Sequence, residues 1–165
     1  MALRKFEVER FSVTTSRPFE TVVTALRAGV GRLDLVAFAK ASRSASTFAD
    51  LEKVIGRDPG STGLMLFIEL DHGAVLRKES GLDKPKIVRL VIGNPLIMLQ
   101  MVRHVPDAGS YAPVTILVDE RPDGVHLSYD RMTSFLSPYG NAEASKVAQD
   151  LDAKVEALLT SSAGS

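Results

Sequence analysis

The sequence contains no cysteine, and it has only three histidines among its 165 residues. A chain without cysteine forms no disulfide and offers no thiol nucleophile or thiolate metal ligand. An excess of charge of one sign is also missing, because 20 basic residues balance 20 acidic residues. General nucleic-acid binders and anionic-membrane binders need a positive field, so we expect neither kind of partner.

Long apolar runs are absent as well. The most apolar stretch, residues 90–102, is interrupted by Asn94, Pro95 and Gln100, and it is shorter than the roughly 20 apolar residues that a membrane span needs. The chain starts directly in strand-like sequence, without the apolar segment of a signal peptide, so we expect a cytoplasmic protein. Its composition, with 45% hydrophobic and 24% charged residues, is typical of one globular domain.

The sequence also lacks the common motifs of metal and catalytic chemistry. The three histidines lie in separate segments without zinc-ligand spacing, so we expect no metal site. No nucleophile elbow of the Gly-x-Ser-x-Gly type, phosphate-binding glycine loop or dinucleotide fingerprint occurs. The sequence therefore indicates no cofactor, and any chemistry would use imidazole, carboxylate, amide or phenol groups.

The hydrophobic periodicity predicts an α+β fold. We expect strands over residues 5–14, 63–71, 87–92, 114–119 and 125–130, the last two forming a hairpin. Long helices are expected after caps at Ser16 and Asn141, and shorter ones over residues 74–80 and after Asn94. Together these predict a mainly antiparallel sheet of about five strands, packed by two long helices. Residues 31–60 would form a helical insertion in a single domain over residues 1–160, and residues 161–165 a flexible tail.

Polar side chains follow two of the predicted strands. Asp71 and His72 come directly after an apolar strand, and the imidazole could act as acid, base or ligand. In the alternative interpretation, Asp71 or His72 only caps the next helix. Gly93 and Asn94 precede a helix whose free N–H groups, from Asn94 to Leu96, could hold an anion. Asn94 could equally serve as a helix cap and nothing more.

Tyr129 is a further candidate for ligand binding. It shares a strand face with Val125 and Leu127, which predicts a core aromatic ring whose hydroxyl emerges at the end of the sheet. His126 lies on the opposite strand face and is expected to face solvent.

The order of several short motifs resembles the domain-of-unknown-function family 302. The motifs are Asp71-His72-Gly73-Ala74, Gly81-Leu82, Pro85, Ile92-Gly93-Asn94-Pro95, Pro113, Asp123-Gly124-Val125 and Leu127-Ser128-Tyr129-Asp130. The resemblance covers roughly residues 62–131 and implies an α+β fold similar to the TATA-binding-protein-like class, with homodimers common. It implies neither DNA binding nor a reaction. It does imply a role for His72, Asn94 and Tyr129, which match positions where family members carry polar signatures.

Two departures from the family pattern matter. Many relatives carry an Asp-Leu-Pro-Leu-Lys run where this chain reads Tyr111-Ala112-Pro113-Val114-Thr115, so a role for that lysine does not carry over. Residues 31–60 are also longer than the usual connection.

Three functions remain open at this point. The first is a homodimer that binds a small molecule or anion in a strand-end pocket lined by His72, Gly93, Asn94 and Tyr129. The second is an enzyme that uses His72 as a general acid or base, held by Asp71. The third is a structural or partner-binding module in which residues 32–56 form an oligomer interface.

Overall fold

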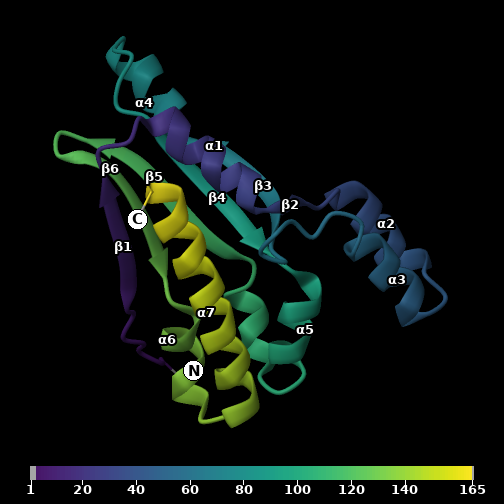
Figure 1. Cartoon of the computed structure of the whole chain (residues 1–165). Coiled ribbons are helices and arrows are strands. Elements are labelled where there is room, and N and C mark those ends of the chain that lie inside the picture. The colour runs from purple at the N-terminus through teal and green to yellow at the C-terminus, as the bar shows by residue number, and fades with distance from the viewer. Residues whose placement is uncertain (1–2, 165) are drawn as a thin grey trace.

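A six-stranded sheet organises the computed structural model, which describes residues 3–164 (Figure 1). The strands are β1 (Arg10–Thr15), β2 (Gly31–Arg32), β3 (Met65–Asp71), β4 (Ile87–Gly93), β5 (Val114–Arg121) and β6 (Gly124–Asp130). Their order across the sheet is β1-β6-β5-β4-β3-β2, and only the short β2 runs parallel to its neighbour. The predicted α+β class with a mainly antiparallel sheet is confirmed, with six strands instead of about five.

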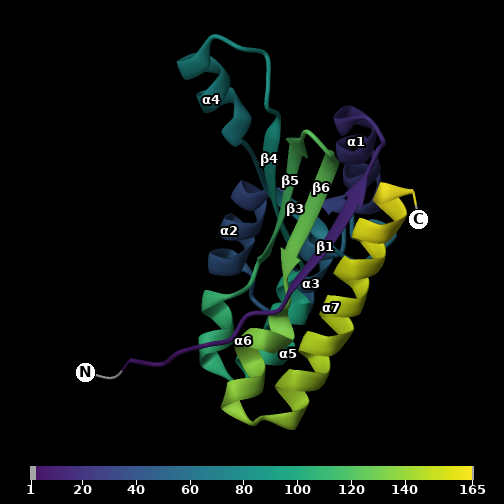
Figure 2. The same ribbon diagram turned by 90° about the vertical axis from the view of Figure 1, so that its left-hand side faces the viewer.

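The two longest helices cover one face of this sheet, which we call the inner face. The α-helices are α1 (Phe19–Gly29), α2 (Leu35–Ser44), α3 (Phe48–Ile55), α4 (His72–Ser80), α5 (Pro95–Val102), α6 (Met132–Leu136) and α7 (Ala142–Ala163). Among the described residues there are also two short 3₁₀ helices, η1 (Pro106–Ser110) before β5 and η2 (Ser137–Tyr139) before α7. The two longest helices, α1 and α7, lie side by side on the inner face (Figure 2). The main hydrophobic core fills the space between them and the sheet.

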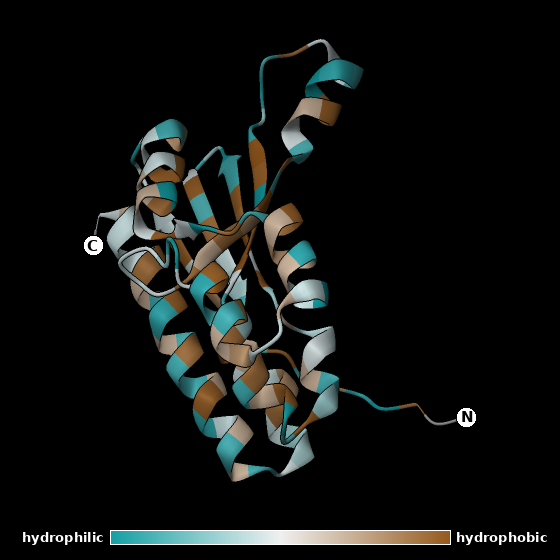
Figure 3. Cartoon of the chain, turned by 90° about the vertical axis from the view of Figure 1, so that its right-hand side faces the viewer, coloured by the Kyte–Doolittle hydropathy of each residue, from teal (hydrophilic) through white to brown (hydrophobic). Residues whose placement is uncertain are grey.

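The outer face of the sheet is open over much of its length. Side chains alternate along β5, where Ile116 and Val118 are buried and the outward Thr115 and Leu117 are half-buried. On β4 the outward Arg89 is exposed. Apolar and polar bands alternate along the central strands in Figure 3. This alternation is the period-two pattern of a sheet with one face packed on the core and one toward water.

The predicted insertion over residues 31–60 is present as α2 and α3. The side chains of Asp34 and Thr47 cap these helices by accepting backbone N–H bonds. A small second core of Leu33, Ile55 and Met65 fixes the insertion to the body of the protein. Helix α2 itself has no buried residue, so it is held only through half-buried contacts.

Helix α4 projects away from the body of the protein at the far end of β3 and β4 (Figures 1 and 2). It ends at Gly81, which adopts a left-handed conformation with φ of 71°. Glycine suits this position because it has no Cβ to clash there.

The starts of two predicted elements differ from the structure. The first strand begins only at Arg10, because Asp130 is its last partner on β6 and the chain after Asp130 turns into α6. The first long helix starts at Phe19 and has no side-chain cap from Ser16. On the outer face of β3, 44% of Ile68 and 39% of Leu70 remain exposed.

The predicted tail from residue 161 is helical through Ala163. The last carbonyls of α7 find partners, because Thr15 donates to the Ala163 carbonyl and Arg17 donates to the Ser162 carbonyl. Side chains that satisfy terminal carbonyls extend a helix beyond what composition suggests. Within residues 3–164, no helix is both long and apolar enough to cross a bilayer.

Candidate functional site

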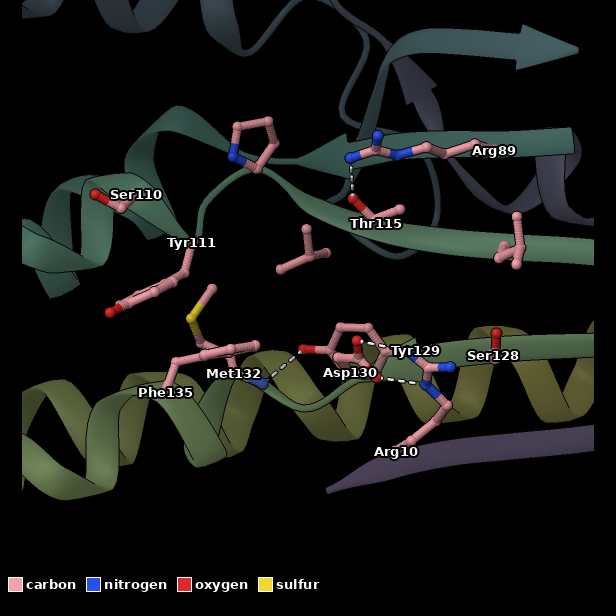
Figure 4. A pocket seen from close by; sticks show the side chains of 13 residues that line it. Arg10, Arg89, Ser110, Tyr111, Thr115, Ser128, Tyr129, Asp130, Met132 and Phe135 are labelled. Atoms are coloured by element: carbon pink, nitrogen blue, oxygen red, sulfur yellow. Dashed lines mark hydrogen bonds and ion pairs between the residues drawn. The ribbon is translucent and has the colours of Figure 1, made fainter. Parts of the chain in front are cut away.

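A cavity of about 440 Å³ opens on the outer face, where β5 begins and β6 ends (Figure 4). Four strands supply polar groups, since Arg10 comes from β1, Arg89 from β4, Thr115 from β5, and Ser128 and Asp130 from β6. We call this cavity the polar pocket. Its position follows from strand register, because Arg89 and Ser128 both lie opposite Leu117 on β5.

Two arginines line the polar pocket, and they differ in how their charge is balanced. Arg10 and Asp130 form two hydrogen bonds of 2.6 and 2.9 Å, which neutralise both side chains. This pairing raises the pKa of Arg10 above its ordinary value, mainly through the hydrogen bond. Arg89 donates only to the hydroxyl of Thr115, at 3.2 Å. Among the described residues, no carboxylate forms an ion pair with Arg89.

Aromatic rings close one end of the polar pocket. Tyr111 stacks on Phe135 with ring centroids 4.8 Å apart and an angle of 15° between the planes. Phe6 packs edge-on against Tyr111 at 6.0 Å. The Tyr111 hydroxyl lies 3.2 Å from that of Tyr139, and this hydrogen bond raises the pKa of Tyr139 to about 12. The wall therefore offers flat apolar surface next to the charged groups (Figure 4).

Tyr129 forms the floor of the polar pocket, but its hydroxyl does not emerge as predicted. The hydroxyl donates at 2.6 Å to Asp152, a carboxylate on α7 with no exposed surface. Asp152 also accepts the backbone N–H groups of Met132 and Thr133 and the Thr133 hydroxyl, at 2.6–3.1 Å. A buried carboxylate on one helix thus caps the start of another, where negative charge is favourable.

Burial strongly raises the pKa of Tyr129, and the adjacent Asp152 carboxylate raises it further. The phenol stays protonated at neutral pH and is already engaged as a donor. Tyr129 is therefore a positioning residue that fixes the end of β6, and it offers no free hydroxyl to a ligand.

Gly93 and Asn94 line a second cavity of about 200 Å³, which we call the apolar cavity. The Asn94 side chain accepts from the Leu96 N–H at 2.8 Å and donates to the Gly63 carbonyl at 2.9 Å. The predicted cap of α5 is confirmed. Because the oxygen and the nitrogen of the amide each bond to the backbone, the Asn94 side chain serves the fold.

Asp71 and His72 lie at the opposite end of the sheet from Asn94. In the register of β3 with β4, Asp71 faces Val88 whereas Met65 faces Gly93. Six residues of strand separate Val88 from Asn94, which corresponds to roughly 20 Å. The structure therefore does not bring His72 and Asn94 into one pocket.

The local contacts at this end favour the capping interpretation. Asp71 accepts the Ala74 N–H at 2.8 Å and pairs with Arg77. The hydrogen bond from Arg77 lowers the pKa of Asp71, which keeps it a carboxylate. His72 is exposed as the first residue of α4, and it lines neither cavity.

The residues that the sequence interpretation missed are mainly on the outer face. Arg89 interrupts an apolar strand, and strict alternation of β4 and β5 places it beside Thr115. Asp152 lies four residues after Ala148 on the apolar stripe of α7, which is a signal for a buried acid. His126 does occupy the outer face, but it contacts Asp123 at 2.9 Å and Thr14 at 3.2 Å instead of facing open solvent.

Residues 3–164 contain no group of three or more acidic or histidine side chains arranged to hold a metal ion.

Comparisons with known proteins relate the chain to a family and a solved structure. The family model described as "Domain of unknown function DUF302" matches residues 38–162. A search of curated proteins finds no match. A crystal structure of an uncharacterized conserved DUF302 protein from Bacillus stearothermophilus has a similar fold, with a TM-score of 0.61 and 14% sequence identity. The similarity covers 91% of this chain and 94% of that one.

Proposed function

The chain belongs to the DUF302 family, and from the geometry of its outer sheet face we propose that it binds a small anionic molecule in the polar pocket. The observation that carries this proposal is the contrast between the two arginines. Asp130 neutralises Arg10, whereas Arg89 contacts only a hydroxyl. The pocket therefore holds one positive charge that a ligand can neutralise.

The chemistry of the walls narrows the class of ligand. A guanidinium presents several N–H donors in a fork that suits carboxylate and phosphate oxygens. Thr115 and Ser128 add hydroxyl groups on the same face, and Tyr111 with Phe135 adds flat apolar surface. A volume of about 440 Å³ lies within the range of small-molecule sites. These features support a carboxylate- or phosphate-bearing metabolite of modest size.

A stability screen tests this proposal. The melting temperature would be measured at constant ionic strength in the presence of phosphate, sulfate, acetate or succinate. Uncharged acetamide and buffer without additive serve as controls. A ligand that binds only the folded state raises the melting temperature, and sulfate and phosphate also stabilise folded proteins in general, so the anions should stabilise the wild type more than Arg89→Gln, and acetamide should affect the two equally. Equal shifts of melting temperature by the anions in the two proteins would overturn the proposal.

We also propose that the protein is a homodimer. Ten large hydrophobic side chains are exposed among the described residues, and five of them come from residues 68–82. They are Ile68 and Leu70 on β3, Val75 and Leu76 on α4, and Leu82. We call this set the arm surface, since α4 projects from the body and carries apolar residues (Figure 3). Apolar surface gathered in this way marks interaction sites.

The insertion offers a smaller alternative interface through Leu35, Val36 and Phe48. The enzyme alternative has less support, because neither cavity reaches His72 and Asp71 is bound to Arg77. The cytoplasmic location stays a prediction.

A further inference from the structure

We propose that the apolar cavity is a second binding site, for a compact uncharged aromatic or alkyl group. It lies between α2, α5 and the start of β5, and it is separate from the polar pocket except for the shared walls Pro113 and Val114. The proposal does not depend on anion binding, because no residue that carries the anion argument lines this cavity.

The size of the cavity is the first observation. The cavity is partly open to the surface, so a small ligand can reach it from solvent. A volume of about 200 Å³ exceeds the roughly 150 Å³ of an engineered apolar cavity that stays dry and binds benzene. There is room for one aromatic ring with a small substituent.

The chemistry of the walls is the second observation. None of the lining residues is charged. Asn94 is the one amide side chain among them, and both of its polar ends are bonded to the protein. A trapped water needs two to four polar partners, which these walls do not supply. An uncharged apolar group is therefore the favoured occupant, because its transfer from water into this cavity carries no cost of desolvating a polar or charged group.

The shape of the cavity depends on a glycine. A Cβ at Gly93 would lie 3.2 Å from the Cβ of Pro113 and 3.5 Å from the ring of Phe67. Any side chain at this position would crowd the wall. The opposite wall contains Met98 and Met101, and methionine side chains adapt to ligands of different shape.

The insertion provides a route of entry. Phe38 is the residue of α2 that lines the cavity. Because Phe38 is only half-buried and α2 has no buried residue, outward movement of α2 exposes little core. Segments with few buried apolar contacts open most easily. Helix α2 is therefore the wall of this site that can move most easily.

Methionine methyl NMR can separate the two sites. Met98 and Met101 line the apolar cavity, and Met132 lines the polar pocket. Toluene and benzoate serve as matched probes, since they share one ring and differ in charge. Toluene should shift the Met98 and Met101 methyl signals and leave the Met132 signal unchanged.

Cavity-filling variants complete the test. Ile97→Phe and, independently, Met98→Phe should weaken toluene binding about 10- to 200-fold, the cost of losing room for one or more carbon groups in an apolar pocket. Val8→Phe places the same ring at an exposed position that lines neither cavity and should leave binding unaltered. The proposal is overturned if toluene moves neither Met98 nor Met101, or if both filled variants bind it as the wild type does. Benzoate shifts confined to Met132 would support the anion site alone, so the two proposals fail independently.

Discussion

Arg10 and Asp130 are directly paired across β1 and β6, and their side chains meet through two hydrogen bonds of 2.6 and 2.9 Å. This pair lies at the edge of the polar pocket, beside the unpaired Arg89. The pairing sets the charge of the pocket at one excess positive charge. It also makes Asp130 the group that limits how strongly an anion is attracted.

The first prediction concerns Asp130. Asp130→Asn preserves the shape of the side chain and removes its charge, so Arg10 becomes available to an anion. Affinity for inorganic phosphate should rise about threefold or more, since Coulomb's law gives about 0.7 kcal/mol for unit charges roughly 6 Å apart in water. Calorimetry at low salt measures this change. The loss of fold stability should be small because the ion pair is largely exposed. A decrease in phosphate affinity would contradict the assigned role of Asp130.

The second prediction concerns the buried carboxylate of α7. Asp152→Ala should lower the free energy of unfolding by about 3 kcal/mol or more, because each buried donor left without an acceptor costs about 1–3 kcal/mol. The donors are Tyr129, Met132 and Thr133. Urea denaturation provides the measurement. Asp150→Asn, on the exposed side of the same helix, is the control and should change stability by less than about 0.5 kcal/mol.

The third prediction concerns high pH. The pKa of Tyr129 is raised in the folded protein, whereas an unfolded tyrosine ionises near pH 10. Above that pH the unfolded chain releases a proton that the folded chain retains. The contribution of Tyr129 to the free energy of unfolding is therefore full below about pH 10 and falls as pH rises further. Tyr129→Phe should reduce this fall between pH 9 and about pH 11 in urea denaturation. An identical pH dependence in the variant would show that Tyr129 does not retain its proton.

The sequence predicted most of the framework, because hydrophobic periodicity and helix caps are local signals. Asn94 and Asn141 cap the helices that they were expected to cap. The prediction of one pocket shared by His72 and Asn94 was wrong. Strand register places these residues near opposite ends of β4, and register depends on long-range pairing. The polar pocket was missed for the same reason. Arg89, Ser128 and Arg10 are distant in sequence and meet only when the sheet forms.

The fourth prediction concerns assembly. Light scattering should give the wild-type protein twice the mass of one chain. Val75→Asp combined with Leu82→Asp places charges on the arm surface, where both side chains are largely exposed, and it should yield monomers. Val36→Asp on α2, where the side chain is 80% exposed, is the matched control and should remain dimeric. If Val36→Asp alone dissociates the protein, the insertion is the interface, and a monomeric wild type rules out the dimer.

The most direct test of the anion site is Arg89→Gln, measured by titration with inorganic phosphate while the Met132 methyl signal is followed. Arg89 is the one arginine of the polar pocket without a carboxylate partner among the described residues, and a charged hydrogen bond contributes about 1.5–3 kcal/mol. The variant should therefore bind phosphate about 10- to 150-fold more weakly than the wild type. Arg43→Gln, an exposed arginine on α2, should bind it unchanged. Equal phosphate affinity in Arg89→Gln and the wild type, or a wild type whose Met132 signal does not respond, would contradict the proposed site.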